Sequence, residues 1–224
     1  MERVAQGLRE FRVGPEALSA LREVLGWYVG TRNYHNLTSH RKADDPSCSR
    51  YITSFTAGEP WVREEDGREW VRLQVDGQSF LLHQIRKMVG VAVDVARGGA
   101  DKDCFEWAFS KDKMTVPLAP SDGLYLERPF FDKYNARCPE GQALRWETGP
   151  ATERLERFKE EKIVEHILAR EATSHNFTRW LYNLHAFPGT YRTDPATTAA
   201  TTAPGSEPAA GAQAAAGGGE PTVM

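Results

Sequence analysis

The sequence predicts an α+β fold in which a mixed or antiparallel sheet is flanked by helices. Two stretches rich in β-branched and aromatic residues, 49–57 and 69–75, are followed at once by a long apolar stretch with helical spacing, 76–97. An amphipathic stretch, 15–29, precedes them. Strands that follow one another and then give way to helices are typical of α+β domains, not of alternating β-α-β folds.

The composition favours one sizeable domain, alone or with an appendage and a tail. The formal net charge of −3 does not by itself suggest a nucleic-acid partner, although the local field at a groove decides such binding. No apolar run is long enough to span a membrane and no signal peptide begins at Met1, so we expect no membrane contact. The cysteines are widely spaced without a metal-binding pattern, so we expect reduced thiols inside a cell and no metal site. They are Cys48, Cys104 and Cys138.

A helix and a loop come first along the chain. Residues 15–29 have an apolar face, and Pro15 and Gly30 suit the beginning and the end of a helix. Residues 30–42 have no clean period, so we predict a loop. It is the most basic short segment of the chain, and its interleaved Tyr and Asn side chains suit stacking on, or hydrogen bonding to, the bases of a nucleic acid, while a solvated surface loop explains the segment equally well. Its basic side chains are Arg32, His35, His40, Arg41 and Lys42.

Two antiparallel strands are predicted to lead into the long helix. Residues 49–57 and 69–75 alternate between apolar and polar side chains, and Asp66-Gly67 between them is a hairpin-type turn. Ser79 is the predicted N-cap of the following helix, and Gly98-Gly99 is its predicted stop.

The long helix is apolar around most of its circumference, so we expect it to be buried on nearly all sides. A narrow polar stripe nevertheless runs along it. A buried cation needs a partner, because an unpaired charge out of water costs on the order of several kcal/mol. Alternatively, the basic side chains reach water from an ordinary core helix. At Gly90 another backbone or a nucleotide has room to approach. The stripe consists of His83, Arg86, Lys87 and Gly90.

The later elements are less regular. We predict a short helix at 101–109, a stiff loop at 117–123 that contains two prolines, and a strand at 124–131. Two further amphipathic helices are predicted at 152–170 and 174–184, and the residues from 188 onward are dominated by Ala, Gly, Thr and Pro, so we expect disorder there. The inward residues of the first of these helices are predicted to be Leu155, Phe158, Ile163 and Ile167.

Four motifs follow one another in order. They are Gly30-Thr31-Arg32-Asn33-Tyr34-His35-Asn36, then Arg50-Tyr51-Ile52, then the segment from Gln78 to Gly90, and then Ala119-Pro120-Ser121-Asp122-Gly123-Leu124-Tyr125-Leu126. They resemble the C-terminal half of the catalytic domain of TruA-family tRNA pseudouridine synthases. Asp45-Pro46-Ser47-Cys48-Ser49-Arg50 and Lys133-Tyr134-Asn135 resemble the eukaryotic branch of that family, and the resemblance covers about residues 14–135.

The sequence departs from the family pattern at the nucleophile. In the family this residue is an aspartate in a G-R-[ST]-D-x-G-V-H motif in the N-terminal half of the domain, and these 224 residues do not contain that motif. Arg192-Thr193-Asp194 is followed by Pro195 in a low-complexity stretch, so we interpret it as coincidence. We therefore expect the chain to lack the half that carries the catalytic aspartate.

The resemblance implies isomerisation of uridine to pseudouridine in tRNA without a cofactor, because a carboxylate can serve as nucleophile or base. The uridine must leave its stack to be reached. Arg86 is the candidate partner of the absent aspartate, since an opposite charge within hydrogen-bond reach keeps a buried carboxylate ionised. Leu124 resembles the apolar residue that lines the uracil pocket, although without the motif a plain core leucine explains it as well. His83 and Lys87 contact the RNA backbone or pack against it.

Together these features predict three regions: residues 1–138 as the C-terminal half of the catalytic domain, 139–186 as a helical extension and 187–224 as a disordered tail. The predicted partner is tRNA, with small nuclear RNA and messenger RNA as further substrates that the resemblance allows. The resemblance also implies the nucleus or the mitochondrion as the location, or both. The alternative function is that of a non-catalytic RNA-binding remnant, or a truncated version, of such an enzyme.

Overall fold

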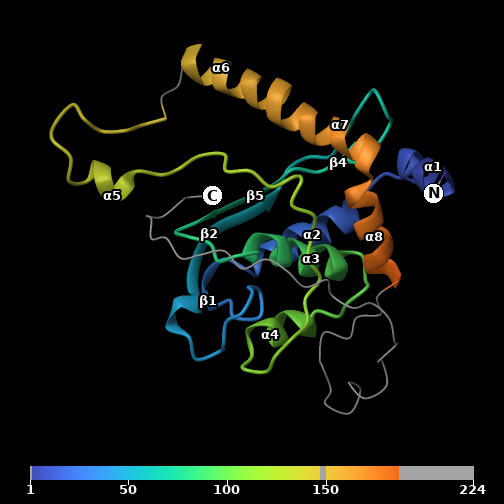
Figure 1. Cartoon of the computed structure of the whole chain (residues 1–224), viewed down its shortest axis with the longest axis horizontal. Helices are drawn as coiled ribbons and strands as arrows, with labels where there is room; N and C mark the ends of the chain where they lie inside the picture. The colour runs from blue at the N-terminus through green and yellow to red at the C-terminus, as the bar shows by residue number, and fades with distance from the viewer. Residues whose placement is uncertain (1, 147–149, 187–224) are drawn as a thin grey trace, which may run out of the picture. The chain divides into compact units, whose positions relative to one another are not determined.

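The computed structural model describes residues 2–146 and 150–186, which form two compact units (Figure 1). The first unit comprises residues 2–124 and 150–186, and the second comprises residues 125–146. Helices flank two small antiparallel sheets in the first unit, which confirms the predicted α+β class. The boundary predicted after residue 138 stays a prediction, and the predicted tail lies outside the described residues.

The main sheet has three strands. Its central strand, β2 (Ser49–Ala57), pairs antiparallel with β1 (Gly30–Asn33) on one side and with β5 (Leu73–Gly77) on the other. Ile52, Phe55 and Ala57 of β2 are buried in the core. The pairing of β2 with β5 shifts its register between Ile52 and Ser54, and this irregularity lets Ile52 and Phe55, which are three residues apart, both reach the core. The strand predicted at 49–57 is therefore confirmed.

A small hairpin lies between β2 and β5. In it β3 (Trp61–Val62) pairs with β4 (Glu69–Trp70) across the predicted Asp66-Gly67 turn, where Gly67 takes a φ of 70°. A positive φ costs glycine little, so the turn prediction is confirmed. The single strand predicted over 69–75 is wrong, because its first two residues pair with β3 while the later ones pair with β2.

The loop predicted over residues 30–42 is wrong at its beginning. Residues 30–33 form β1, because their backbone groups find partners on β2, and such pairing lies outside the reach of local periodicity. The residues that follow turn inward, and Tyr34 and Leu37 are fully buried.

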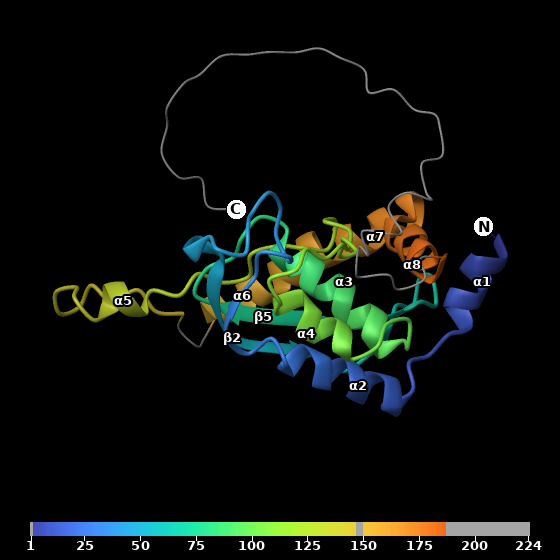
Figure 2. The ribbon, with the colours of Figure 1, turned by 90° about the horizontal axis from the view of Figure 1, so that it is seen from below.

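Three helices cover the sheet. Helix α2 (Pro15–Gly26) packs against β2 and against α3 (Gln84–Ala96), and α4 (Asp103–Phe109) completes this layer (Figure 2). The helices predicted at 15–29 and 101–109 are confirmed, with ends that differ by a few residues. An aromatic cluster fills the core between these helices and the sheet. It contains Tyr28, Tyr34, Phe55, Phe105 and Phe109.

The long helix, α3, begins at Gln84, so the predicted N-cap at Ser79 is wrong. His83 has a φ of 64°, a left-handed conformation that an L-residue does not adopt inside an α-helix. Phe80, which was predicted to lie in the helix, packs on the end of β5, where a Cβ at Gly77 would lie 3.1 Å from its ring. The predicted stop is confirmed, since Gly98 follows the helix with a φ of 73°.

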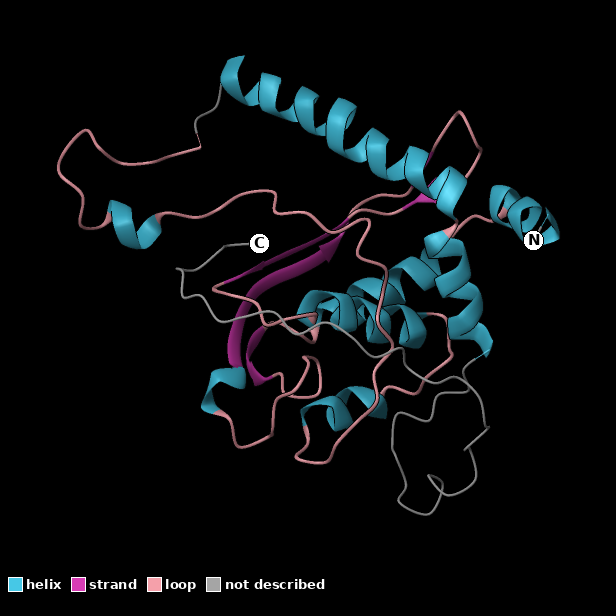
Figure 3. Ribbon diagram, in the orientation of Figure 1, coloured by secondary structure: helices cyan, strands magenta, loops and turns pink. Residues whose placement is uncertain are grey.

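No strand forms over residues 124–131, so that prediction is wrong. A strand needs a hydrogen-bonded neighbour, and within the described ranges this stretch has no ladder partner. Figure 3 draws it as loop.

A long helical rod follows in the first unit. It consists of α6 (Pro150–Phe158), a π-helical segment (Lys159–Val164) and α7 (Glu165–Ser174), and a sharp turn then leads into α8 (Asn176–Ala186). In Figure 1 the strands of the main sheet run between this rod and the α2–α3 pair. The helices predicted at 152–170 and 174–184 are thereby confirmed in their type.

The predicted inward orientation of Leu155 and Phe158 is wrong, since both side chains are exposed. From Glu160 onward the rod pairs with three arginines of the hairpin region. The pairs are Arg72–Glu160, Arg63–Glu165 and Arg68–Glu171.

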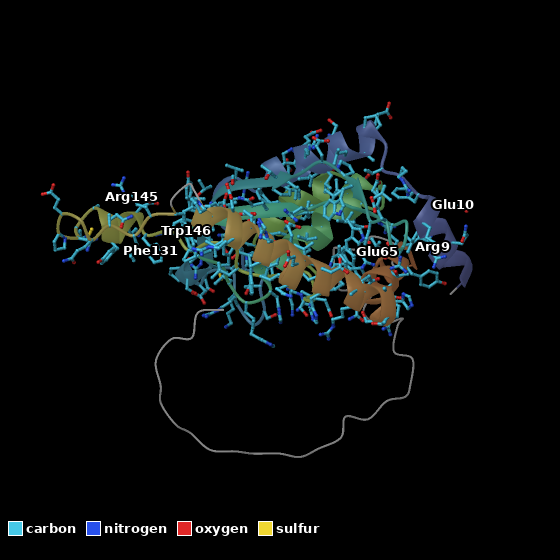
Figure 4. All side chains as sticks on the ribbon, turned by 90° about the horizontal axis from the view of Figure 1, so that it is seen from above. Arg9, Glu10, Glu65, Phe131, Arg145 and Trp146 are labelled. Carbon is cyan, nitrogen blue, oxygen red and sulfur yellow. The ribbon has the colours of Figure 1, made fainter. Side chains whose placement is uncertain are left out.

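Two further pieces complete the description (Figure 4). Helix α1 (Glu2–Glu10), which the sequence did not predict, ends beside the hairpin turn, where Arg9 lies close to Gly67. The second unit contains α5 (Asp132–Asn135) and folds back on itself, because Trp146 Nε1 donates to Pro129 O at 2.8 Å.

Candidate active site

Arg86 lies on the first turn of α3 and holds the loop at residues 117–123, hereafter the proline loop. Its Nε donates to Ala119 O at 2.6 Å, and Ala119 N donates to the backbone oxygen of Arg86 at 3.2 Å. Its Nη1 lies 3.5 Å from His83 Nδ1. Within residues 2–146 and 150–186 the half-buried Arg86 makes no ion pair with a carboxylate. Its charge and its remaining donors are therefore available to a group outside these residues.

Gly90 lets the proline loop approach α3 one turn beyond Arg86. A Cβ at Gly90 would lie 2.2 Å from Pro117 O, a distance that no side chain tolerates. The close approach predicted at this glycine is confirmed, and the neighbour is another part of the chain. The missing side chain thus brings Ala119 within reach of the guanidinium.

Lys87 faces the protein interior. Its Nζ donates to Thr38 O at 2.6 Å and to Asn36 O at 3.1 Å. Burial, with a smaller contribution from Lys113, lowers the pKa of this amine. Two of its three donors are therefore used to hold the turn at 36–38 against α3, which does not favour the predicted contact with RNA.

Buried polar side chains fix the chain on either side of this turn. Asn36 donates to Asp112 O at 2.8 Å and accepts from Met114 N at 3.0 Å. Thr38 Oγ1 donates to Leu82 O at 2.9 Å, just before the left-handed residue that opens α3. The sequence favoured contact of the Asn side chains of this segment with bases, whereas Asn36 is buried and holds the backbone. It assigned no role to Thr38.

Exposed apolar side chains come from the two segments that Arg86 joins. Phe80 and Leu82 precede α3, while Leu118 and Leu124 belong to the proline loop and the residue after it. Leu124 is 47% exposed, which does not fit a plain core leucine. Exposed apolar side chains on the segments that flank an oriented charge suit a site for a flat, partly polar ring.

The structure separates the basic residues of the predicted RNA-binding set. The guanidinium of Arg32 stacks over Phe109 at 5.0 Å and over Phe105 at 5.4 Å, and His35 is buried. Arg41 and Lys42 are exposed, and Arg41 pairs with Asp45 at 2.9 Å. His83 is half-buried beside Arg86. Of the set, Arg41 and Lys42 lie on the surface, and all these RNA contacts stay predictions.

Burial of His35 gives folding a pH dependence. Desolvation lowers the pKa of its imidazole, and its Nε2 is buried without a hydrogen-bond partner. Above the ordinary histidine pKa of about 6.5 both the folded and the unfolded states are neutral at this site. Below it the unfolded chain binds a proton first, so the free energy of unfolding should fall as the pH falls toward the lowered folded pKa.

Urea unfolding between pH 7.5 and 5 measures this effect. His35→Gln should flatten the pH dependence, whereas His166→Gln, at an exposed position on α7, should leave it unchanged. An identical slope in the His35 variant and the unmodified chain would contradict the assignment.

Two searches of the described ranges give negative results. No helix there is long and apolar enough to cross a membrane. No group of three or more His, Cys, Asp or Glu side chains is placed there to hold a metal ion.

The residues that carry this geometry lie in a part of the chain that is similar to known proteins. Residues 26–132, which include Arg86 and Leu124, match the family model described as tRNA pseudouridine synthase. The chain is 39% identical over 185 residues to the pseudouridylate synthase 1 homolog of Homo sapiens, and this match covers 80% of the chain and 42% of that protein. The corresponding mouse protein is 40% identical over 187 residues, with 80% and 43% covered.

A fungal relative extends the comparison. The tRNA pseudouridine synthase 1 of Yarrowia lipolytica is 37% identical over 188 residues, which cover 80% of the chain and 34% of that protein. The chain thus spans less than half the length of these relatives. The match runs through the helix, the loop and the strands that build the candidate site, and the chain belongs to the tRNA pseudouridine synthase family.

Proposed function

We propose that this chain forms part of an enzyme that isomerises uridine to pseudouridine in tRNA. The observation that carries the proposal is the state of Arg86. It is half-buried and oriented by a carbonyl, it lies between segments with exposed apolar side chains, and it has no carboxylate partner among the described residues. A nucleophilic aspartate is the group that such an arginine suits.

In the proposed reaction the bond between N1 of a flipped-out uracil and C1′ of its ribose breaks, and a bond between C5 and C1′ forms. The proton on C5 is then lost to solvent and N1 gains a proton, so the base is isomerised without a cofactor. The aspartate acts as nucleophile or base and must be ionised to do so. Its motif does not occur in these 224 residues, so the proposal assigns it to a part of the enzyme outside them. Arg86 keeps that carboxylate ionised and oriented, and Leu124 contacts the apolar face of the uracil.

The names of the relatives support tRNA as the substrate, since several are called tRNA pseudouridine synthase 1. The same chemistry would serve uridines in small nuclear RNA and messenger RNA, and the proposed location is the nucleus or the mitochondrion, or both. Arg41 and Lys42 are the surface cations that we assign to the phosphate backbone.

A segment exchange tests the proposal. Residues 14–186 of this chain would replace the corresponding segment of the mouse relative, which would supply the rest of the enzyme. Tritium release from tRNA labelled at C5 of uridine should occur with the exchanged enzyme, and the 224-residue chain alone should release none. Parallel reactions with small nuclear and messenger RNA would define the substrate class.

The exchanged enzyme must first be shown to fold and to bind tRNA. A folded, tRNA-binding enzyme that releases no tritium would contradict the proposal and favour a non-catalytic RNA-binding role. Release by the 224-residue chain alone would contradict the assignment of the nucleophile to residues outside it.

A further inference from the structure

The end of α7 and the beginning of α8 contact the proline loop. Asp122 Oδ1 accepts a hydrogen bond from Asn176 Nδ2 at 3.1 Å and forms an ion pair with Arg170, whose Nε lies 3.0 Å away. Phe177 packs so closely on the same loop that a Cβ at Gly123 would lie 2.9 Å from its ring. These contacts join the C-terminal helices to the segment that carries Ala119 and Leu124.

The helical side of this contact is itself fixed. The buried carboxylate of Glu171 accepts from Phe177 N at 2.9 Å and from Thr178 N at 3.0 Å, so it caps the beginning of α8. Arg68 Nη1 lies 3.6 Å from the same carboxylate, and Trp70 packs edge-on against Phe177. Contacts with the β3–β4 hairpin therefore fix the beginning of α8 and Phe177 independently of the proline loop.

The loop side leads directly to the candidate active site. Ala119 exchanges two hydrogen bonds with Arg86, and Leu124 N donates to Ser121 O at 3.0 Å. Only two residues, Pro120 and Ser121, separate the carbonyl that orients Arg86 from the carboxylate held by α7 and α8. A displacement of Asp122 would therefore move both the Ala119 carbonyl and Leu124.

The individual contacts differ in strength. Arg170 is 59% exposed, and an ion pair with so exposed a partner contributes little by itself. Asp122 is mostly buried, however, and its carboxylate also accepts a hydrogen bond from the amide of Asn176. The tight packing of Phe177 on Gly123 adds a contact that solvent does not weaken.

We propose that Asp122 is a positioning residue, through which the C-terminal helices α7 and α8 hold the proline loop in the geometry that orients Arg86 and presents Leu124. The value of this geometry for catalysis rests on the proposed function. The helices lie beyond the part of the chain that the family model matches, which ends at residue 132. Although they lie outside that part, α7 and α8 thus help to hold the candidate active site in place.

The test uses the 224-residue chain labelled with ¹⁵N and observed by NMR. Hydrogen exchange of the Ala119 amide and the Arg86 Nε–H resonance report on the loop, and the Val91 amide within α3 reports on global opening. Arg86→Lys identifies the Nε–H signal by its loss. Asp122→Ala should accelerate exchange at Ala119 and at Arg86 Nε–H at least tenfold, with less than a twofold change at Val91.

Matched variants separate positioning from general stability. Asn176→Ala should accelerate exchange at the same two signals. In the double variant with Asp122→Ala the exchange rates should exceed those of Asp122→Ala alone by less than twofold, because both substitutions remove the same contact. Asp122→Asn keeps an acceptor oxygen and should restore most of the protection. Glu165→Ala removes an ion pair between α7 and Arg63 of the hairpin and should leave both loop signals within twofold of the unmodified chain.

The proposal would be overturned by unchanged exchange at Ala119 in Asp122→Ala, or by an equal acceleration in Glu165→Ala. It would also be overturned if Val91 accelerated as much as Ala119, since the effect would then be global. None of these signals requires catalysis. A failure here would leave the proposed reaction intact, and absence of tritium release from the segment exchange would leave this contact intact.

Discussion

Arg86→Met, introduced into the segment-exchanged enzyme, is expected to lower turnover at saturating tRNA roughly 10²–10³-fold, the loss typical when one oriented electrostatic group is removed from an active site. Methionine keeps much of the stem and deletes the charge, so the nucleophilic carboxylate would lose its partner and its pKa would rise. The affinity for tRNA should change far less. Tritium release under tRNA saturation, beside binding at several salt concentrations, measures both quantities.

Arg86→Lys is the matched variant, because it keeps the charge but loses the planar group that donates to Ala119 O and to a carboxylate together. Its turnover should lie between those of the unmodified enzyme and Arg86→Met. If Arg86 bound phosphate, Met would instead weaken tRNA binding and reduce its salt dependence by about one phosphate contact. If Arg86 were only a core residue whose charge reaches water, Met would be nearly neutral in both assays.

Gly90→Ala is expected to have the largest effect on stability. The added methyl would lie 2.2 Å from Pro117 O, and the obstacle is backbone that cannot rotate away. Overpacking of this kind costs typically about 1–3 kcal/mol. For a chain of this size the melting temperature should fall by roughly 2–12 °C.

Gly26→Ala provides the control. Gly26 also lies in a helix, but within the described residues, its chain neighbours and its own helix backbone aside, no atom lies within 4 Å of an added Cβ. Since alanine favours helices over glycine, this variant should melt at the same temperature as the unmodified chain or slightly above it. Equal melting temperatures for the two variants in a thermal unfolding series would show that the proline loop does not press on α3.

The elements that the sequence predicted well are those with a clean local period. Strand β2 is rich in β-branched and aromatic residues and α2 carries an apolar face that begins at a proline, so both were placed closely, although the register shift within β2 between Ile52 and Ser54 could not be predicted. Strand β1 has only four residues and owes its form to pairing with β2, which no local pattern reports. Helix α3 begins later than predicted because His83 has a left-handed conformation, which the presence of a histidine does not by itself predict.

The candidate site divides in the same way. Arg86 could be singled out because a charge on an apolar helix requires a partner. The carbonyl that orients it lies 33 residues later in the chain, and only the fold reveals it. Arg86 and Lys87 are adjacent cations, and the sequence does not show which way each side chain points from the helix. The helix turns Lys87 toward the carbonyls of Asn36 and Thr38, while Arg86 keeps donors for another group.

The pH dependence of single-turnover rates, measured with saturating tRNA in the segment-exchanged enzyme, tests most directly whether Arg86 is the partner of the nucleophile. The reaction needs the carboxylate ionised, so the rate must fall on the acid side of the profile. An arginine partner lowers such a pKa by about 1–3 units. Arg86→Met should therefore move the acid limb up by a comparable amount while lowering the plateau, whereas an acid limb at the same pH in both enzymes would contradict the pairing.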